Sequence, residues 1–179
     1  MMKITLVRHA QTESNYLGNI QGRSNEILND TGRRQAQRLK EKIKDIKYDY
    51  CYMSPLVRCV ETALILIGER VEMIPDKRLI ERDMGELEGR PFQEYNAYRF
   101  WDYDLNRDDY GVESVHSIIN RCDEFLNYIK KKYKGQNILI VTHSAPYRAL
   151  RHLLKKNKLR GNLLDGEIDN CKIEEFVIE

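Results

Sequence analysis

The amino-acid sequence predicts an α/β fold built on a mainly parallel central sheet. Short apolar runs, such as residues 2–7 and 137–142, alternate along the chain with longer segments whose apolar residues recur at helical spacing. Strands that alternate with helices are typical of parallel sheets, because each helix carries the chain back to the edge where the next strand begins. A length of 179 residues suits one domain, and we expect residues 1–179 to form it.

The predicted elements follow this alternation in order. Ser54 and Pro55 favour the start of a helix, as N-cap and first helical residue. The last strand alternates less regularly than the others, which is compatible with an antiparallel edge strand. Strand composition is found at residues 2–7, 49–53, 71–74, 137–142 and 172–178. Helical spacing is found at about residues 31–46, 55–69, 92–102, 114–132 and 145–156.

Composition argues against several classes of partner. The formal net charge is +2, which gives no reason to expect nucleic-acid binding, and the basic segments 130–132 and 151–160 are interpreted as solvated helix ends. No apolar run approaches the roughly 18 residues of a membrane span. The four cysteines have no metal-ligand spacing and follow no secretory signal, so we expect reduced thiols in a cytoplasmic protein.

Arg8 and His9 follow directly after the first predicted strand, and a polar turn comes next. Ligands of open α/β sheets bind just outside the carboxyl ends of the strands. Arginine offers a planar fork of donors that matches phosphate, and a neutral histidine is a nucleophile near neutral pH. The pair therefore predicts an anion site with a nucleophile.

His143 stands at the end of the strand predicted at 137–142, before a second helical pattern. One histidine in such a place is as often a hydrogen-bonded structural residue as a functional one. Two histidines at equivalent junctions, one of them beside Arg8, favour a shared site.

Arg58 lies in the first turn of the helix predicted at 55–69, where a cation opposes the helix dipole. A bound anion would resolve this conflict, and the alternative is a surface arginine. Four carboxylates follow at Glu81, Asp83, Glu86 and Glu88. One of them could donate a proton if burial raised its pKa, and the alternative is an acidic solvated loop; the residues alone do not identify which.

Four segments, in this order, resemble the histidine phosphatase superfamily of phosphoglycerate-mutase-like enzymes: LVRHAQTESN, SPLVRCVETA, ERDMGELEG and VTHSAPYRAL. The segment ILNDTGRRQA resembles the start of a helix in the same family. The likeness extends over essentially the whole chain. It implies a three-layer α/β/α sandwich with a phosphoglycerate-mutase-like fold and catalysis through phosphohistidine.

The resemblance also implies roles for individual residues. His9 would be the nucleophile, and Glu81 would be the proton donor among the four carboxylates. Ser144-Ala145 stands where a double glycine is common, and Glu26 where some phosphatases have aspartate; neither removes a catalytic group. Arg8, Arg58 and a protonated His143 would line the phosphate pocket. Phosphate or substrate would also be contacted by Asn15, Gln21, Gly22 and the backbone of Ser144.

By this resemblance the protein is expected to hydrolyse a small-molecule phosphate ester without a metal or other cofactor. α-Ribazole 5′-phosphate and sugar phosphates are candidate substrates, and the protein could be a monomer or a homodimer. One alternative is a cofactor-dependent phosphoglycerate mutase, against which the short chain argues. The other is a catalytically silent module that senses a phosphorylated ligand, against which the retained nucleophile and acid argue.

The segment 90–111 is rich in aromatic and charged residues, among them Tyr95, Arg99 and Trp101. The family places a substrate-capping insertion here, and we expect the segment to roof the pocket and select the leaving group. The alternative is ordinary core packing of a short helix.

Overall fold

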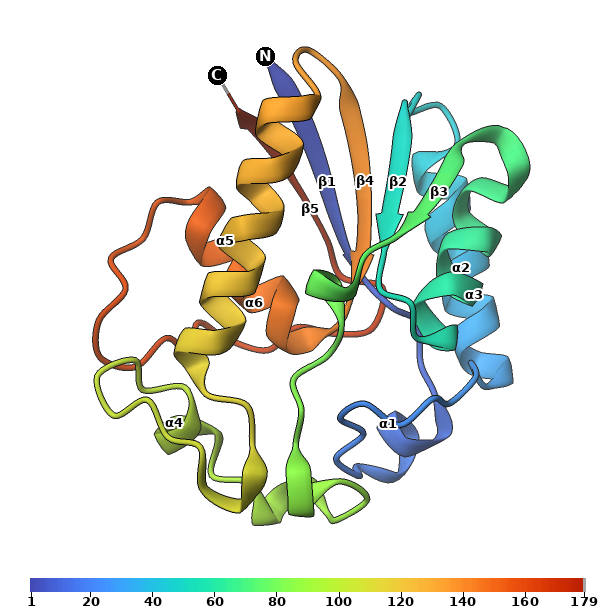
Figure 1. The fold of residues 1–179 in the computed structure, drawn as a ribbon. Coiled ribbons are helices and arrows are strands. Elements are labelled where there is room, and N and C mark those ends of the chain that lie inside the picture. Colours follow the sequence, from blue (N-terminus) through green and yellow to red (C-terminus); the bar gives the residue numbers. More distant parts are fainter. Residues whose placement is uncertain (179) are drawn as a thin grey trace.

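The computed structural model describes residues 1–178 and has a five-stranded sheet of order β3-β2-β4-β1-β5 at its centre (Figure 1). Neighbours among the first four strands in this order are parallel, and β5 is antiparallel to β1 at the edge. The predicted α/β class and the antiparallel last strand are thereby confirmed. The strands are β1 (Met2–Arg8), β2 (Tyr50–Met53), β3 (Glu72–Pro75), β4 (Asn137–Thr142) and β5 (Ile173–Ile178).

Helices cover both faces of the sheet, so the predicted three layers are present. Figure 1 shows α2 and α3 on one side, and α5 and α6 on the other. The predicted helix at 92–102 is instead a 3-10 turn at Phe92–Glu94 followed by the single turn α4. The helices are α1 (Glu13–Leu17), α2 (Asp30–Ile43), α3 (Val57–Ile67), α4 (Ala97–Phe100), α5 (Val115–Lys132) and α6 (Ser144–Leu154).

The central strand β4 is buried on both faces, which explains its unbroken apolar sequence ILIV. In β4, Ile138 and Ile140 pack in the core beneath α5 and α6, whereas Leu139 and Val141 pack in the core beneath α2 and α3. All four are fully buried, and each such side chain contributes about 1.5–3 kcal/mol relative to an exposed one. The site residues follow the carboxyl ends of the strands anchored by this packing.

Three local details differ from the predictions. The N-cap of α3 is Leu56, which makes no side-chain capping bond, so Ser54 and Pro55 precede the helix rather than begin it. Helix α1 was not predicted; it is held by a capping box between Thr12 and Asn15. Arg151 was expected to be solvated but is 5% exposed, because it is paired with Asp165 and Glu174.

Within residues 1–178, no helix is long and apolar enough to cross a membrane.

The contact between Gly32 in α2 and the loop after β1 yields a stability prediction. A Cβ at Gly32 would lie 2.1 Å from the carbonyl oxygen of Gln11. Glycine-to-alanine changes inside helices usually stabilise, but here Gly32→Ala should lower the free energy of unfolding by about 1–3 kcal/mol, because α2 must move away from that loop. Urea denaturation measures this. A Gly32→Ala variant as stable as the native protein, or more stable, would contradict the close approach.

Candidate active site

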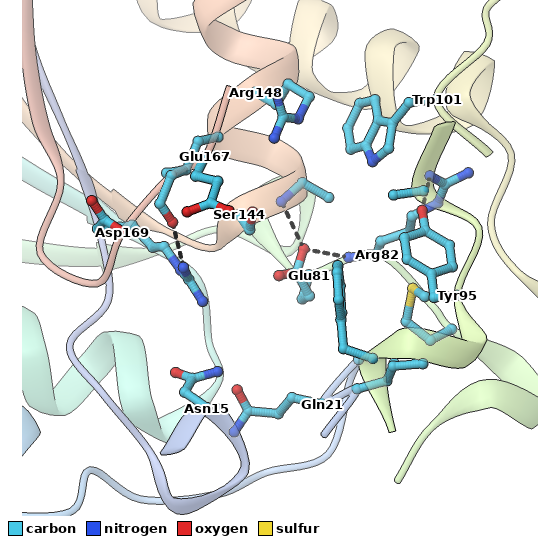
Figure 2. Close-up of a pocket in the computed structure, with 18 of the residues that line it drawn as sticks. Asn15, Gln21, Glu81, Arg82, Tyr95, Trp101, Ser144, Arg148, Glu167 and Asp169 are labelled. Atoms are coloured by element: carbon cyan, nitrogen blue, oxygen red, sulfur yellow. Dashed lines mark hydrogen bonds between the residues drawn. The ribbon is translucent and has the colours of Figure 1, made fainter. Parts of the chain in front are cut away.

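A cavity of about 520 Å³ opens beyond the carboxyl ends of β1 and β4 (Figure 2). Seven of the nine predicted site residues line it: Arg8, His9, Asn15, Gln21, Gly22, Glu81 and Ser144. Arg58 and His143 do not line it; both are fully buried behind the wall that carries His9. The predicted residues are therefore gathered at one place, in two layers.

His9 is 1% exposed, and its ring is held in one tautomer. Its Nδ1 lies 2.7 Å from the carbonyl oxygen of Ala10. Since a carbonyl only accepts hydrogen bonds, Nδ1 carries the proton and the lone pair is on Nε2. Burial, followed by the guanidiniums of Arg58 and Arg8, lowers the pKa of His9 well below its ordinary value. The ring is therefore neutral and has its nucleophilic nitrogen free.

Arg8 provides the cation beside this nucleophile. One terminal nitrogen donates to the carbonyl of Ile168, which fixes the guanidinium against the C-terminal loop. Its Nε–H is buried and has no acceptor among residues 1–178. Arg8 also lines the cavity, and a guanidinium at a cavity wall is a site for an anion.

His143 is hydrogen-bonded at both ring nitrogens. The Nε–H of Arg58 donates to Nδ1 at 3.1 Å, so Nδ1 must be unprotonated, and Nε2 lies 2.7 Å from the hydroxyl oxygen of Ser54. Burial foremost, then the charges of Arg58, His9 and Arg8, lower its pKa well below the ordinary value. The expectation of a protonated His143 is wrong for this structure, because a buried imidazole that accepts from a guanidinium cannot keep a second proton.

Arg58 is completely buried, which contradicts the surface alternative. Its two terminal nitrogens donate to the carbonyls of Ser24 and Gly22, at 2.6 and 2.8 Å. The N–H donors of Arg58, for which the sequence suggested an anion as partner, are therefore bound by two protein carbonyls and by His143. The side chain ties the loop at 19–25 to the end of β4.

Glu81 is the member of the four-carboxylate group that lines the cavity. Its Oε1 accepts from the backbone N–H groups of Arg82 and Ala145, at 2.9 and 3.1 Å, as the dashed lines in Figure 2 show. The Ala145 N–H belongs to the first turn of α6, so the carboxylate caps that helix end. Its other oxygen has no hydrogen-bond partner in the described part of the chain, residues 1–178, and can exchange a proton with a bound group.

Two amides complete the wall opposite Glu81. The Oδ1 of Asn15 accepts from the backbone of Thr12 at 3.3 Å and from the Nδ2 of Asn170 at 3.0 Å. Its Nδ2 is consequently the donor that faces the cavity. Gln21, 8% exposed, is held through its Nε2, which donates to Thr12 and Glu26.

Sequence reasoning missed several residues of this site. Asn170 donates to the backbone oxygen of His9 at 3.1 Å; its segment, IDNCKIEEF, also resembles the family, but no site role was predicted for it. Arg148, which flanks the indole of Trp101, does follow Ser144 by four residues on one helix, and that spacing was a usable signal. Arg82 is 1% exposed and donates to the Tyr95 hydroxyl at 2.9 Å; nothing in its acidic surroundings indicated burial.

The aromatic segment 90–111 contributes Phe92, Tyr95, Ala97 and Trp101 to the cavity wall. Arg99, from the same segment, lines a different and smaller depression. The segment thus covers the side of the cavity away from β1.

Comparisons with known proteins agree with this geometry. The family model described as the histidine phosphatase superfamily (branch 1) matches residues 4–179. Phosphoglycerate mutase-like protein 4 of Arabidopsis thaliana is 37% identical over 83% of this chain and 69% of its own length. The metal-independent phosphoserine phosphatase of the same plant is 32% identical over 93% of this chain and 74% of its own. A phosphoserine phosphatase mutant from Entamoeba histolytica, solved with phosphoserine, superposes with a TM-score of 0.85 at 27% identity, covering 100% of this chain and 92% of that one.

The two buried imidazoles make stability depend on pH. Because their pKa values are lowered in the folded state, the unfolded chain binds protons below about pH 6.5 that the folded chain does not. The free energy of unfolding should therefore be unaffected by these groups above about pH 7 and should fall as the pH drops below about 6.5, by about 1.4 kcal/mol per pH unit for each histidine. Denaturation of the protein and of His143→Gln at several pH values checks this. If the free energy of unfolding fell equally steeply with decreasing pH in the native protein and in His143→Gln, a neutral His143 would be contradicted.

Proposed function

The chain belongs to the histidine phosphatase superfamily (branch 1), and from that premise we propose that it hydrolyses phosphomonoesters of small metabolites through a phosphohistidine formed on His9. One observation carries the proposal: a neutral, buried His9 with its proton on Nδ1 shares a cavity with the guanidinium of Arg8 and with Glu81, whose Oε1 alone is bonded to backbone N–H groups. These are a nucleophile, an anion-binding donor and a proton donor in one space.

In the first step, Nε2 of His9 attacks phosphorus while the ester oxygen leaves. Charge on the equatorial oxygens is met by Arg8, by the Nδ2 of Asn15 and by the backbone N–H of Ser144 at the N-terminus of α6. The free oxygen of Glu81 protonates the departing alcohol. In the second step, the same carboxylate removes a proton from the attacking water.

Arg58 and His143 act from behind this wall. Arg58 adds positive potential and fixes the loop that carries Gly22, and His143 connects Arg58 to the end of β4. Arginines and a helix terminus supply the positive charge that a metal ion supplies in other phosphatases, so the proposed steps need none.

The leaving group would occupy the half of the cavity formed by Ile20, Met84, Tyr95 and Trp101. This half is apolar and aromatic, and it suits the carbon skeleton of a sugar, a nucleoside-like ring or an amino acid. Phosphoserine, α-ribazole 5′-phosphate and sugar phosphates are the substrates to test first.

A panel of metabolite phosphates, assayed with a chelator present, tests the proposal. Release of inorganic phosphate should continue in chelator and should fall at least about a thousandfold in His9→Ala, because the covalent route is lost. His116→Ala, a histidine outside the cavity, is the matched control and should keep full activity. Isomerisation of phosphoglycerate without phosphate release would indicate a mutase. Phosphate binding without any turnover would indicate a sensing module.

A second prediction concerns the aromatic segment. Tyr95→Ala removes a cavity-lining ring and should change the ratio of kcat/KM between a ring-bearing ester and a small ester by about tenfold. Arg99→Ala changes the same segment outside this cavity and should leave the ratio unaltered. Steady-state kinetics on the two substrates measure this ratio. A ratio in Tyr95→Ala that equals that of the native protein would contradict selection of the leaving group by this segment.

A further inference from the structure

The amide of Gln21 is turned in one direction by its partners. Its Nε2 donates to the hydroxyl of Thr12 at 2.9 Å and to the carboxylate of Glu26. A carboxylate only accepts hydrogen bonds, so the nitrogen must face Glu26 and the oxygen must face the other way. Figure 2 shows this oxygen directed toward the open space beside Asn15, and no donor among residues 1–178 reaches it.

Glu26 is itself fixed, because its other oxygen accepts from the backbone N–H of Ser14 at 3.1 Å, at the start of α1. The orientation of Gln21 is therefore set by two residues outside the cavity. The Gln21 amide is therefore oriented oppositely to the Asn15 amide, whose N–H donor faces the cavity. One wall thus presents a hydrogen-bond donor and an acceptor side by side.

An acceptor next to a bound phosphoryl group has an unusual consequence. Its oxygen repels the phosphoryl oxygens, so its partner must carry a proton. That partner is either a donor on the leaving alcohol or the water that attacks after the alcohol has gone. A water whose two O–H groups point to two acceptors, the free oxygen of Glu81 and the Oε1 of Gln21, has a lone pair left to face phosphorus.

We propose that Gln21, oriented by Glu26, positions the water that hydrolyses phospho-His9; this inference rests on the proposed function. The water oxygen bonds to phosphorus as the P–Nε2 bond breaks, and that electron pair returns to His9. One water proton passes to Glu81, and the other stays on the product phosphate while hydrogen-bonded to Gln21. The assigned role belongs to the second step alone.

The test uses 4-nitrophenyl phosphate, whose leaving group carries no hydrogen-bond donor, in chelator with rapid mixing. Gln21→Leu should still release a burst of nitrophenolate at close to the native rate. Breakdown of the phosphoenzyme, followed after quenching in base, should be slower by about 10- to 100-fold. Glu26→Ala, which leaves the cavity lining intact, should slow the same step by a smaller factor. Gln93→Leu, an exposed glutamine next in sequence to the cavity-lining Phe92, is the matched control and should leave both steps unchanged.

Partition with an added alcohol gives a readout that misfolding would not produce. Glycerol needs only Glu81 as base, because its attacking hydroxyl has a single proton. In Gln21→Leu, the ratio of phosphoglycerol to inorganic phosphate should rise by about the same factor by which the rate of phosphoenzyme hydrolysis falls.

Three outcomes are distinguishable. A native protein that never forms a phosphoenzyme would overturn the proposed function itself. A normal phosphoenzyme that breaks down at the native rate in Gln21→Leu would overturn the role in water positioning alone. A defect confined to the first step would also overturn the role in water positioning, because Gln21 would then act on phosphoryl transfer to His9.

Discussion

The buried guanidinium of Arg58 is the contact on which the rest of the site depends. It bonds the end of β4 through His143 and the loop at 19–25 through the carbonyls of Gly22 and Ser24. Its own carbonyl accepts from the hydroxyl of Thr62, and that hydroxyl oxygen accepts from the backbone of Ala10 at 3.1 Å. One residue in the first turn of α3 therefore joins three segments around His9. Leaving such a charge buried without these acceptors would cost several kcal/mol, so the segments are held in one arrangement.

The same arrangement explains why both histidines are neutral. Two guanidiniums, Arg8 and Arg58, lie close enough to lower the pKa of His9 and of His143, and burial acts in the same direction. A nucleophile that stays unprotonated in acid is compatible with a neighbouring carboxyl group that must donate a proton. The positive field that attracts the phosphate is thus also what keeps the attacking nitrogen free.

Much of this could be predicted from the sequence. The alternation of elements and the strand ends that carry Arg8, His9 and His143 are local patterns. The parallel pairing of β1 with β4 then brings these three residues close together. The protonation of His143 could not be predicted, because it depends on Arg58 reaching it from another element. Nor could the direction of the Gln21 amide, which depends on Glu26. The burial of Arg151 was missed because its partners Asp165 and Glu174 lie beyond the helix, in segments whose path no periodicity defines.

The end of the first strand and the segment that leads into the last strand meet at the nucleophile. Strand β5 pairs with β1, Ile168 accepts from Arg8, and Asn170 donates to the carbonyl of His9 and to Asn15. The sequence separation between Arg8 and Ile168 is 160 residues, so the anion site is among the most non-local contacts in the fold. During synthesis on a ribosome, the residues of the nucleophile emerge first and those that hold them emerge last. A nascent chain that has not reached Asn170 carries His9 without its complete surroundings, and so the site is assembled only after nearly all of this sequence has been translated.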